Sequence, residues 1–393
     1  MFIRRTVPPG LLLSFWLILS FCTHPLVAQA LYDSLDAKLS AIYQQDRLPG
    51  LSVVMVNKKG VLYQKNWGYV RLAEQQVYSN HTIQNIGSVS KTFIAAALMK
   101  AIEQGYFTLE TDINTILPFP VINPNVPQQP IKIKHLVMHT SGIIDNEAIY
   151  LKTYLFDTTG VYSKPAYHLL KQKGYTGGML DTSLSAFMYA YLSQKGNLYG
   201  KANFAVNPPG TSYHYSNIAS ALAGYLIEVK TGMSFATYTQ KYILAPLQMT
   251  HSGWYLHDID QTLHANLYYN REQALPFYSE ITYPDGSLRT CTADMSKYLI
   301  EMIKGYQGTS SLLTRASFQA MFQPQFSATN YPEGIAISKR NKGVFWNIYN
   351  SGIISQDGDD PGVSTYLFFN VKTGVGGFLW LINTSTKPGL FRF

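Results

Sequence analysis

The pattern of apolar and polar residues first predicts a helix and then a pair of strands. Residues Leu31–Asp46 carry apolar side chains at helical spacing and end before Pro49–Gly50, which predicts one amphipathic helix. Leu51–Val56 and Val61–Tyr69 are rich in β-branched and aromatic residues, and the turn-like sequence Lys58–Gly60 separates them. We therefore expect a β-hairpin directly after the first helix.

Helical patterns fill the middle of the chain, and strand patterns return at its end. Residues Ser88–Gln104 are mostly apolar and precede Gly105, which predicts a helix buried on most sides. Helical stretches, including Ile218–Lys230, then alternate with loops rich in proline and glycine. The predicted C-terminal strands are Gly343–Tyr349, Thr365–Asn370 and Val375–Ile382.

This order of elements predicts an α+β fold in which both ends of the chain build one antiparallel sheet. We assign residues 31–91 and about 283–393 to the sheet part, and residues from about 92 to 282 to an inserted, mainly helical part. The chain has 393 residues, of which 46% are hydrophobic and 14% are charged, which is typical of a folded protein. The formal charge of +8 comes from scattered lysines and arginines, which favours weak attraction to anionic surfaces over nucleic-acid binding.

The N-terminus has the three parts of an export signal. Arg4 and Arg5 precede the apolar segment Leu11–Cys22, and Ala28–Ala30 offers small residues for cleavage. The apolar segment is shorter than the roughly 20 residues that span a membrane. We expect residues 1–30 to be removed and the protein to be periplasmic or secreted, with no transmembrane segment afterwards. Cys291 would then be the one remaining cysteine, so no intrachain disulfide is expected.

Two short motifs carry candidate chemistry. Ser88 and Lys91 match the S-x-x-K pattern, and their spacing places both side chains on one face of a helix. A serine hydroxyl needs a nearby base, and a lysine whose pKa is lowered by burial can take its proton. Tyr215 and Asn217 form Y-x-N, which offers a phenol for proton transfer and an amide for orientation. Taken singly, S-x-x-K also occurs by chance, and most tyrosines serve in packing.

Taken together, the ordered motifs resemble those of the class C β-lactamase-related serine hydrolases, a family that includes DD-peptidases, D-amino-acid peptidases and esterases. The resemblance implies a β-lactamase/DD-peptidase-like fold without a cofactor. It also implies that Ser88 is the acylated nucleophile, Lys91 its base, Tyr215 a second proton carrier and Asn217 a substrate-side amide. The motifs that carry the resemblance are Pro49–Val54, Ile86–Phe93, Ile133–Gly142, Pro209–Thr211, Tyr215–Asn217 and Pro246–Met249.

The third motif of the family differs in this chain. Where the family has a lysine or histidine, then a threonine or serine, then a glycine, the matching stretch is Gln356–Gly362, with Gln356 and Gly358 on the substrate side. A literal Lys372–Gly374 follows a predicted strand, so we interpret it as a hairpin turn. Because Gln356 is neutral, the resemblance favours an ester or neutral amide over an acyl donor with a carboxylate. The backbone N–H groups of Ser88 and Asp359 would form the oxyanion hole.

Three further features have structural interpretations. His135 and His139 are separated by four residues, but no glutamate completes a metal motif, so we predict no metal site there. Asp285–Leu288 is expected to be a loop before a helix that begins near Thr292. Related proteins continue into a helix after the last strand, whereas only residues 383–393 follow here, so that helix is expected to be absent or the chain truncated.

We therefore interpret the chain as an exported serine hydrolase that acts through a Ser88 acyl-enzyme on an ester, amide or D-amino-acid peptide-like substrate. The expected partner is a small or peptide-like acyl donor, with no cofactor and no nucleic acid. The alternative is a non-catalytic protein of the same fold that binds or senses cell-wall fragments. The sequence does not indicate an oligomeric state.

Overall fold

The computed structural model describes residues 30–176 and 182–382. It divides into two compact units after Arg47. The described part of the first unit contains a helix over residues 30–45, in agreement with the helix predicted for Leu31–Asp46. The predicted export signal, apart from Ala30, and the segment after Ile382 lie outside the described residues. Among those that are described, no helix is both long enough and apolar enough to cross a bilayer.

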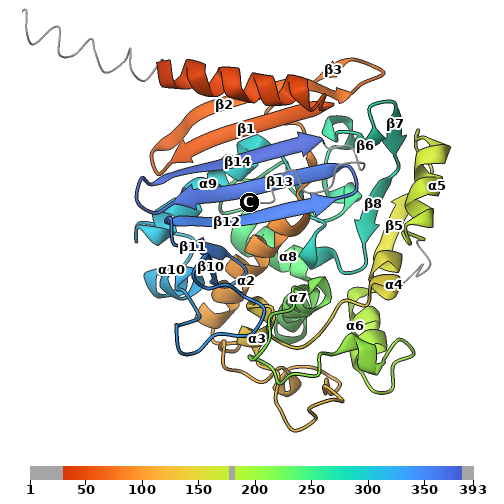
Figure 1. The fold of residues 1–393 in the computed structure, drawn as a ribbon, viewed down its shortest axis with the longest axis vertical. Coiled ribbons are helices and arrows are strands. Elements are labelled where there is room, and N and C mark those ends of the chain that lie inside the picture. Colours follow the sequence, from red (N-terminus) through yellow and green to blue (C-terminus); the bar gives the residue numbers. More distant parts are fainter. Residues whose placement is uncertain (1–29, 177–181, 383–393) are drawn as a thin grey trace, which may run out of the picture. The chain divides into compact units, whose positions relative to one another are not determined.

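The second unit is built on one eight-stranded sheet with the order β10-β11-β12-β13-β14-β1-β2-β3, in which every neighbouring pair is antiparallel. The first and last strands pair along their full length, from Gly50 opposite Ile382 to Asn57 opposite Val375. The sheet is therefore closed by both chain ends, as predicted (Figure 1). Its strands are β1 (Gly50–Asn57), β2 (Gly60–Arg71), β3 (Gln76–Val77), β10 (Arg340–Lys342), β11 (Asn347–Tyr349), β12 (Ile353–Asp360), β13 (Val363–Asn370) and β14 (Val375–Ile382).

The prediction of one strand over Gly343–Tyr349 is wrong. Only its last three residues form a strand, β11, which pairs with β10 just before the segment. Residues 343–346 form the turn between these strands, closed by the Gly343 N–H donating to the Trp346 carbonyl at 2.9 Å. Phe345 adopts a positive φ of 57°. The apolar run reflects a turn that is buried in the core, with Val344, Phe345 and Trp346 each at most 1% exposed. Strand β12 is largely polar, so the apolar pattern did not predict it, and only the family resemblance drew attention to this segment through Gln356–Gly362.

Helices cover the sheet and fill the region beside it. Helix α9 (Thr292–Tyr306) packs against β1 and β14, and begins at the predicted residue. Helix α2 (Lys91–Glu103) lies against α7 (Asn217–Thr231) among the other helices of the inserted region (Figure 1). The remaining α-helices are α3 (Ile133–Val137), α4 (Glu147–Tyr150), α5 (Lys164–Gln172), α6 (Leu184–Leu192), α8 (Phe235–Thr239) and α10 (Arg315–Phe322). Paired short strands are β4 (Gln84–Asn85) with β9 (Arg289–Thr290), β5 (Tyr154–Asp157) with β8 (Phe277–Glu280), and β6 (Leu267–Asn270) with β7 (Gln273–Leu275).

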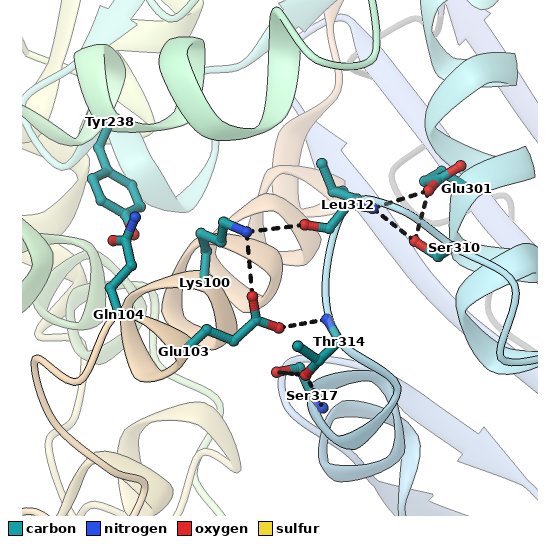
Figure 2. Close-up of polar contacts among 9 residues, drawn as sticks. All are labelled: Lys100, Glu103, Gln104, Tyr238, Glu301, Ser310, Leu312, Thr314 and Ser317. Carbon is teal, nitrogen blue, oxygen red and sulfur yellow. Dashed lines mark hydrogen bonds and ion pairs between the residues drawn. The ribbon is translucent and has the colours of Figure 1, made fainter.

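A polar network ties the C-terminal end of α2 to the start of α10 (Figure 2). The Glu103 carboxylate accepts hydrogen bonds from the Thr314 N–H at 2.6 Å and from Lys100 Nζ at 3.2 Å. Lys100 Nζ also donates to the Leu312 carbonyl at 3.3 Å. Burial raises the pKa of Glu103, but hydrogen bonds from Ser317, Thr314 and Lys100 outweigh it, and the net pKa lies below 4.5.

We expect Glu103→Ala to lower the free energy of unfolding by about 1–2 kcal/mol, because the variant removes a charged acceptor from a backbone donor. Since the folded-state pKa is lowered, this stability is present above the ordinary pKa of 4.5 and is lost as the pH falls through the folded value. Urea unfolding at pH 7 and in acid measures both effects. The control is Glu110→Ala, whose side chain is 59% exposed and should contribute less. Equal losses in the two variants at pH 7 would contradict the prediction.

Candidate active site

Ser88 lies in a turn of 3₁₀-helix, η1 (Gly87–Ser90), that runs directly into α2. The turn begins at Gly87, which has a φ of +52°. A Cβ atom on Gly87 would lie 3.1 Å from the Asp359 nitrogen and from Asp360 Oδ2. Glycine is therefore required here both by the backbone conformation and by the close approach of β12. The result is that Ser88 lies at the end of α2 beside a strand of the sheet.

Three side chains predicted from the motifs, those of Lys91, Tyr215 and Asn217, gather around Ser88. Lys91 Nζ donates to Ser88 Oγ at 2.9 Å, to Asn217 Oδ1 at 2.7 Å and to the Asp285 carbonyl at 2.8 Å. The Tyr215 hydroxyl donates to Ser88 Oγ at 2.7 Å. The serine oxygen thus lies between an amine and a phenol, and both are placed for proton transfer. Helix α2 carries Lys91, and the first turn of α7 carries Asn217.

Both proton-transfer groups have raised pKa values. Burial lowers the pKa of Lys91, but the charges of Tyr215, Asp285 and Glu280 outweigh it and the net pKa is raised. The expectation that burial would lower the Lys91 pKa is therefore wrong, because acidic groups from distant segments surround the amine. Burial also raises the pKa of the Tyr215 phenol, against the opposing effect of Lys91. In the resting site both groups hold their protons at neutral pH.

Asp145 positions the Y-x-N segment, a contact that sequence reasoning missed. Its carboxylate accepts hydrogen bonds from Ser216 Oγ at 2.7 Å, from the Asn217 N–H at 2.7 Å and from the Ile218 N–H at 3.0 Å. These donors form the first turn of α7, where unpaired N–H groups and the helix dipole favour a carboxylate. Asp145 therefore holds Asn217 in place beside Lys91. Its distance in sequence from α7 left no signal in the pattern.

The third motif lies on strand β12, which packs against the turn that carries Ser88. Gln356 is 3% exposed, its Nε2 contacts the Ser88 carbonyl at 3.4 Å, and its Oε1 accepts from Asn347 Nδ2 at 3.4 Å. A Cβ on Gly358 would clash with the Ile86 carbonyl and lie 2.9 Å from the Ser88 nitrogen. Strand β12 therefore packs its backbone against η1, and the Asp359 and Ser88 nitrogens come to the same side of the site. Lys372–Gly374 lies in the turn between β13 and β14 and does not line the pocket.

Ser88 opens into a pocket of about 490 Å³ with walls of opposite charge. The basic wall consists of Arg340 and Lys342, and Asn347 accepts a hydrogen bond from Lys342 there. Sequence reasoning missed all three residues. The basic run Lys339–Lys342 was the one available signal. The other residues that line the pocket include Tyr150, Tyr154, Tyr175, Tyr213, Tyr215, Asn217, Asp285, Gln356, Asp357, Asp359 and Asp360.

Lys342 is a buried cation beside the motif position that lacks one. It is 2% exposed, its Nζ donates to Asn347 Oδ1 at 2.7 Å, and the Tyr213 ring lies 5.4 Å from it. Burial, together with repulsion from Arg340 and Lys91, lowers the pKa of Lys342 to about 7. Within the described part of the chain, no carboxylate forms an ion pair with Lys342 or Arg340. A cationic group is therefore available at this wall.

A buried carboxyl cluster adjoins the acidic wall, which Asp285 and Asp360 line but Glu280 does not. Tyr150 donates to Asp285 Oδ1 at 3.2 Å and Tyr154 to Asp360 Oδ1 at 2.7 Å, while both oxygens of Glu280 lack a hydrogen-bond donor among the described residues. Burial, together with the proximity of other carboxyls, raises the pKa of Glu280, and burial raises that of Asp285 and of Asp360. The predicted loop is confirmed for residues 286–288, whereas Asp285 ends the short 3₁₀-helix η8 (Tyr283–Asp285). Asp285 also contacts Lys91 and lines the pocket.

The two candidate metal histidines make separate local contacts. His135 Nδ1 accepts from the Lys132 N–H at 3.1 Å, and His139 Nδ1 accepts from the Ser216 N–H at 3.2 Å. The His139 ring lies 4.4 Å from the Tyr215 ring, and burial lowers its pKa, so a neutral imidazole supports the phenol. Among the described residues these two histidines belong to no group of potential metal ligands.

Comparison with solved structures identifies the fold. A penicillin-binding protein homologue from Pyrococcus abyssi, described as octameric, aligns with a TM-score of 0.72 and 21% identity, over 91% of this chain and 74% of that chain. A penicillin-binding protein from Bacillus halodurans aligns with a TM-score of 0.63 and 20% identity, over 88% of this chain and 95% of that chain. At these identities the likeness shows the α+β penicillin-binding fold alone.

Comparison of sequences identifies the family. The family model described as Beta-lactamase matches residues 35–391, so the chain belongs to the Beta-lactamase family and has its serine-hydrolase-type fold. Protein flp of Staphylococcus aureus strain MRSA252 is 24% identical over 67% of this chain and 47% of its own length. Penicillin-binding protein 4* of Bacillus subtilis strain 168 is 22% identical over 78% of this chain and 62% of its own length. The chain thus spans about half the length of the first of these relatives and somewhat more of the second.

Proposed function

We propose that this protein is an exported serine hydrolase that forms an acyl-enzyme at Ser88. The observation that carries the proposal is the position of Ser88 Oγ, 2.9 Å from Lys91 Nζ and 2.7 Å from the Tyr215 hydroxyl. A serine used only for packing does not require an amine and a phenol on the same oxygen. Membership of a family of serine hydrolases supports the same reaction class. Export rests on the N-terminal sequence of the chain.

The chemistry proceeds in two steps. Once the Lys91 and Tyr215 pair has lost one proton to solvent, Ser88 Oγ attacks the carbonyl carbon of the acyl donor and its own proton enters the pair. That proton then passes to the leaving group as the bond to it breaks. Water then attacks the acyl-enzyme and gives a proton to the same pair, which passes it to Ser88 Oγ as the ester bond breaks and the acid is released. The backbone N–H groups of Ser88 and Asp359 stabilise the oxyanion in both steps. The position of Asn217 beside Lys91 suits it to orient both the amine and the substrate.

The charge of the pocket walls points to the class of acyl donor. Gln356 alone favoured neutral donors, but Lys342 and Arg340 line the same pocket as Ser88. Asp357 is near enough to stabilise the Lys342 cation but forms no ion-pair contact with it, and a carboxylate of the substrate would add such a contact through charge-assisted hydrogen bonds. We therefore propose donors that carry a carboxylate, such as short peptides with a free C-terminus, ahead of neutral esters.

The test is intact-mass spectrometry of the protein mixed separately with a penicillin and with an activated short-chain ester. We expect an added mass equal to the acyl group, formed faster from the carboxylate-bearing penicillin and absent from Ser88→Ala. An adduct that persists in Ser88→Ala would overturn Ser88 as the nucleophile. No adduct with either reagent, together with unchanged ligand binding by Ser88→Ala, would favour a non-catalytic binding protein of the same fold.

A further inference from the structure

Three potential metal ligands gather outside the Ser88 pocket. His81 lies in the turn between β3 and β4, His251 in the loop between η5 (Gln240–Leu244) and η6 (Leu256–Asp258), and Cys291 directly before α9. One ligand atom from each residue lies within 4.8 Å of the others. None of the three lines the pocket around Ser88. Segments far apart in the sequence therefore bring two imidazoles and one thiol together.

The burial of the three side chains is graded. Cys291 is fully buried, His251 is half-buried and His81 is exposed. The two imidazole rings lie with centroids 4.9 Å apart, and one ligand atom of each lies within 4.8 Å of the buried sulfur. The group thus extends from a surface imidazole to a buried thiol. Packing of apolar side chains alone would not require two imidazoles beside a buried sulfur.

Neighbouring groups hold His251 in position. The backbone N–H of His251 donates to Asp294 Oδ2 at 2.7 Å, and its ring Nδ1 lies 3.2 Å from Thr250 Oγ1. That contact leaves Nε2 as the nitrogen available to a ligand. Metal-binding imidazoles characteristically use one nitrogen for the metal and the other for such an outer contact, which orients the ring. The outer contact is thus already in place.

We propose that His81, His251 and Cys291 form a binding site for a divalent transition metal ion, with Zn²⁺ as the best match. Imidazole nitrogen and thiolate sulfur are the ligands that Zn²⁺ prefers, and a water molecule would complete a tetrahedral set. The sequence pattern predicted no metal, because these three residues share no short motif. The ion would join the β3–β4 turn and the His251 loop to the start of α9, which packs on the sheet. Its role would be structural and independent of the acyl-enzyme.

The test uses protein stripped with EDTA and titrated with ZnCl₂ by calorimetry, and with CoCl₂ by absorbance. We expect one Zn²⁺ per chain, a rise in melting temperature with Zn²⁺, and a near-ultraviolet band from cobalt–thiolate charge transfer. His81→Ala, whose side chain is exposed, should fold and bind at least about tenfold more weakly. Cys291→Ser should lose the cobalt band. His257→Ala is the matched control, because its side chain is 79% exposed and lies outside the group.

Three results would contradict the proposed metal site. No binding near stoichiometric Zn²⁺, equal affinity of wild type and His81→Ala, or a cobalt spectrum without a thiolate band would each overturn it. Because His81 is on the surface, its variant remains informative if Cys291→Ser does not fold. Loss of Ser88 acylation leaves these outcomes unchanged, so this site and the proposed activity can fail separately.

Discussion

Replacing Tyr215 by phenylalanine is expected to slow acylation of Ser88 by about 10²–10⁴-fold, and Lys91→Met by at least as much. Phenylalanine keeps the ring of Tyr215 against His139 but removes the hydroxyl that lies 2.7 Å from Ser88 Oγ. Methionine keeps much of the length of Lys91 but removes the amine that joins Ser88 to Asn217. Each variant removes one member of the proton-transfer pair. The measurement is the rate of adduct formation by intact mass under single-turnover conditions.

The pH dependence of acylation should follow from the same pair. The pKa of Lys91 and the pKa of Tyr215 are both raised, so both groups are protonated at neutral pH and the basic form of the pair grows as the pH increases. With a neutral donor, the acylation rate should therefore rise with pH through the neutral and alkaline range. The control for Tyr215→Phe is Tyr306→Phe, which lies on α9 and outside the pocket. A Tyr215→Phe rate equal to that of this control would contradict the role of the phenol.

The second large effect is expected at the basic wall of the pocket. Lys342→Met should raise KM for a carboxylate-bearing donor by about 100-fold, because it removes a buried cation that pairs with the substrate. Methionine preserves most of the volume, so folding should survive. A neutral ester should be affected little. Lys372→Met is the matched control, since Lys372 belongs to the literal Lys-Thr-Gly sequence but lies in the β13–β14 turn. A larger loss in Lys372→Met would reverse the assignment.

The charge state of Lys342 predicts how KM for a carboxylate-bearing donor depends on pH. Burial lowers its pKa to about 7, so the amine is charged below that pH and becomes neutral above it. KM for the carboxylate-bearing donor should therefore increase as the pH rises through about 7. The neutral ester should show no such increase, and neither should the Lys342→Met variant. The combination distinguishes loss of a binding cation from a general effect of pH on folding.

Strands β1, β2, β13 and β14 and the Ser88–Lys91 pair could be deduced from the sequence. Strands such as Val375–Ile382 bury one or both faces and therefore carry a continuous or alternating apolar pattern. Ser88 and Lys91 are three residues apart at the start of one helix, so helical geometry alone places them together. Tyr215 is 127 residues from Ser88, and only its resemblance to a family motif connected the two.

Only the tertiary structure showed the chemistry of the pocket walls. Lys91 contacts Asp285 across 194 residues, and Asp145 holds Asn217 across 72. The direction of the Lys91 pKa shift depends on Tyr215, Asp285 and Glu280, and no local pattern reports that these groups lie nearby. Lys342 reaches the pocket because β10 lies beside β11 and β12 at the end of the sheet. Local spacing encodes helices and strands, whereas the charge around a buried side chain depends on which distant segments fold against it.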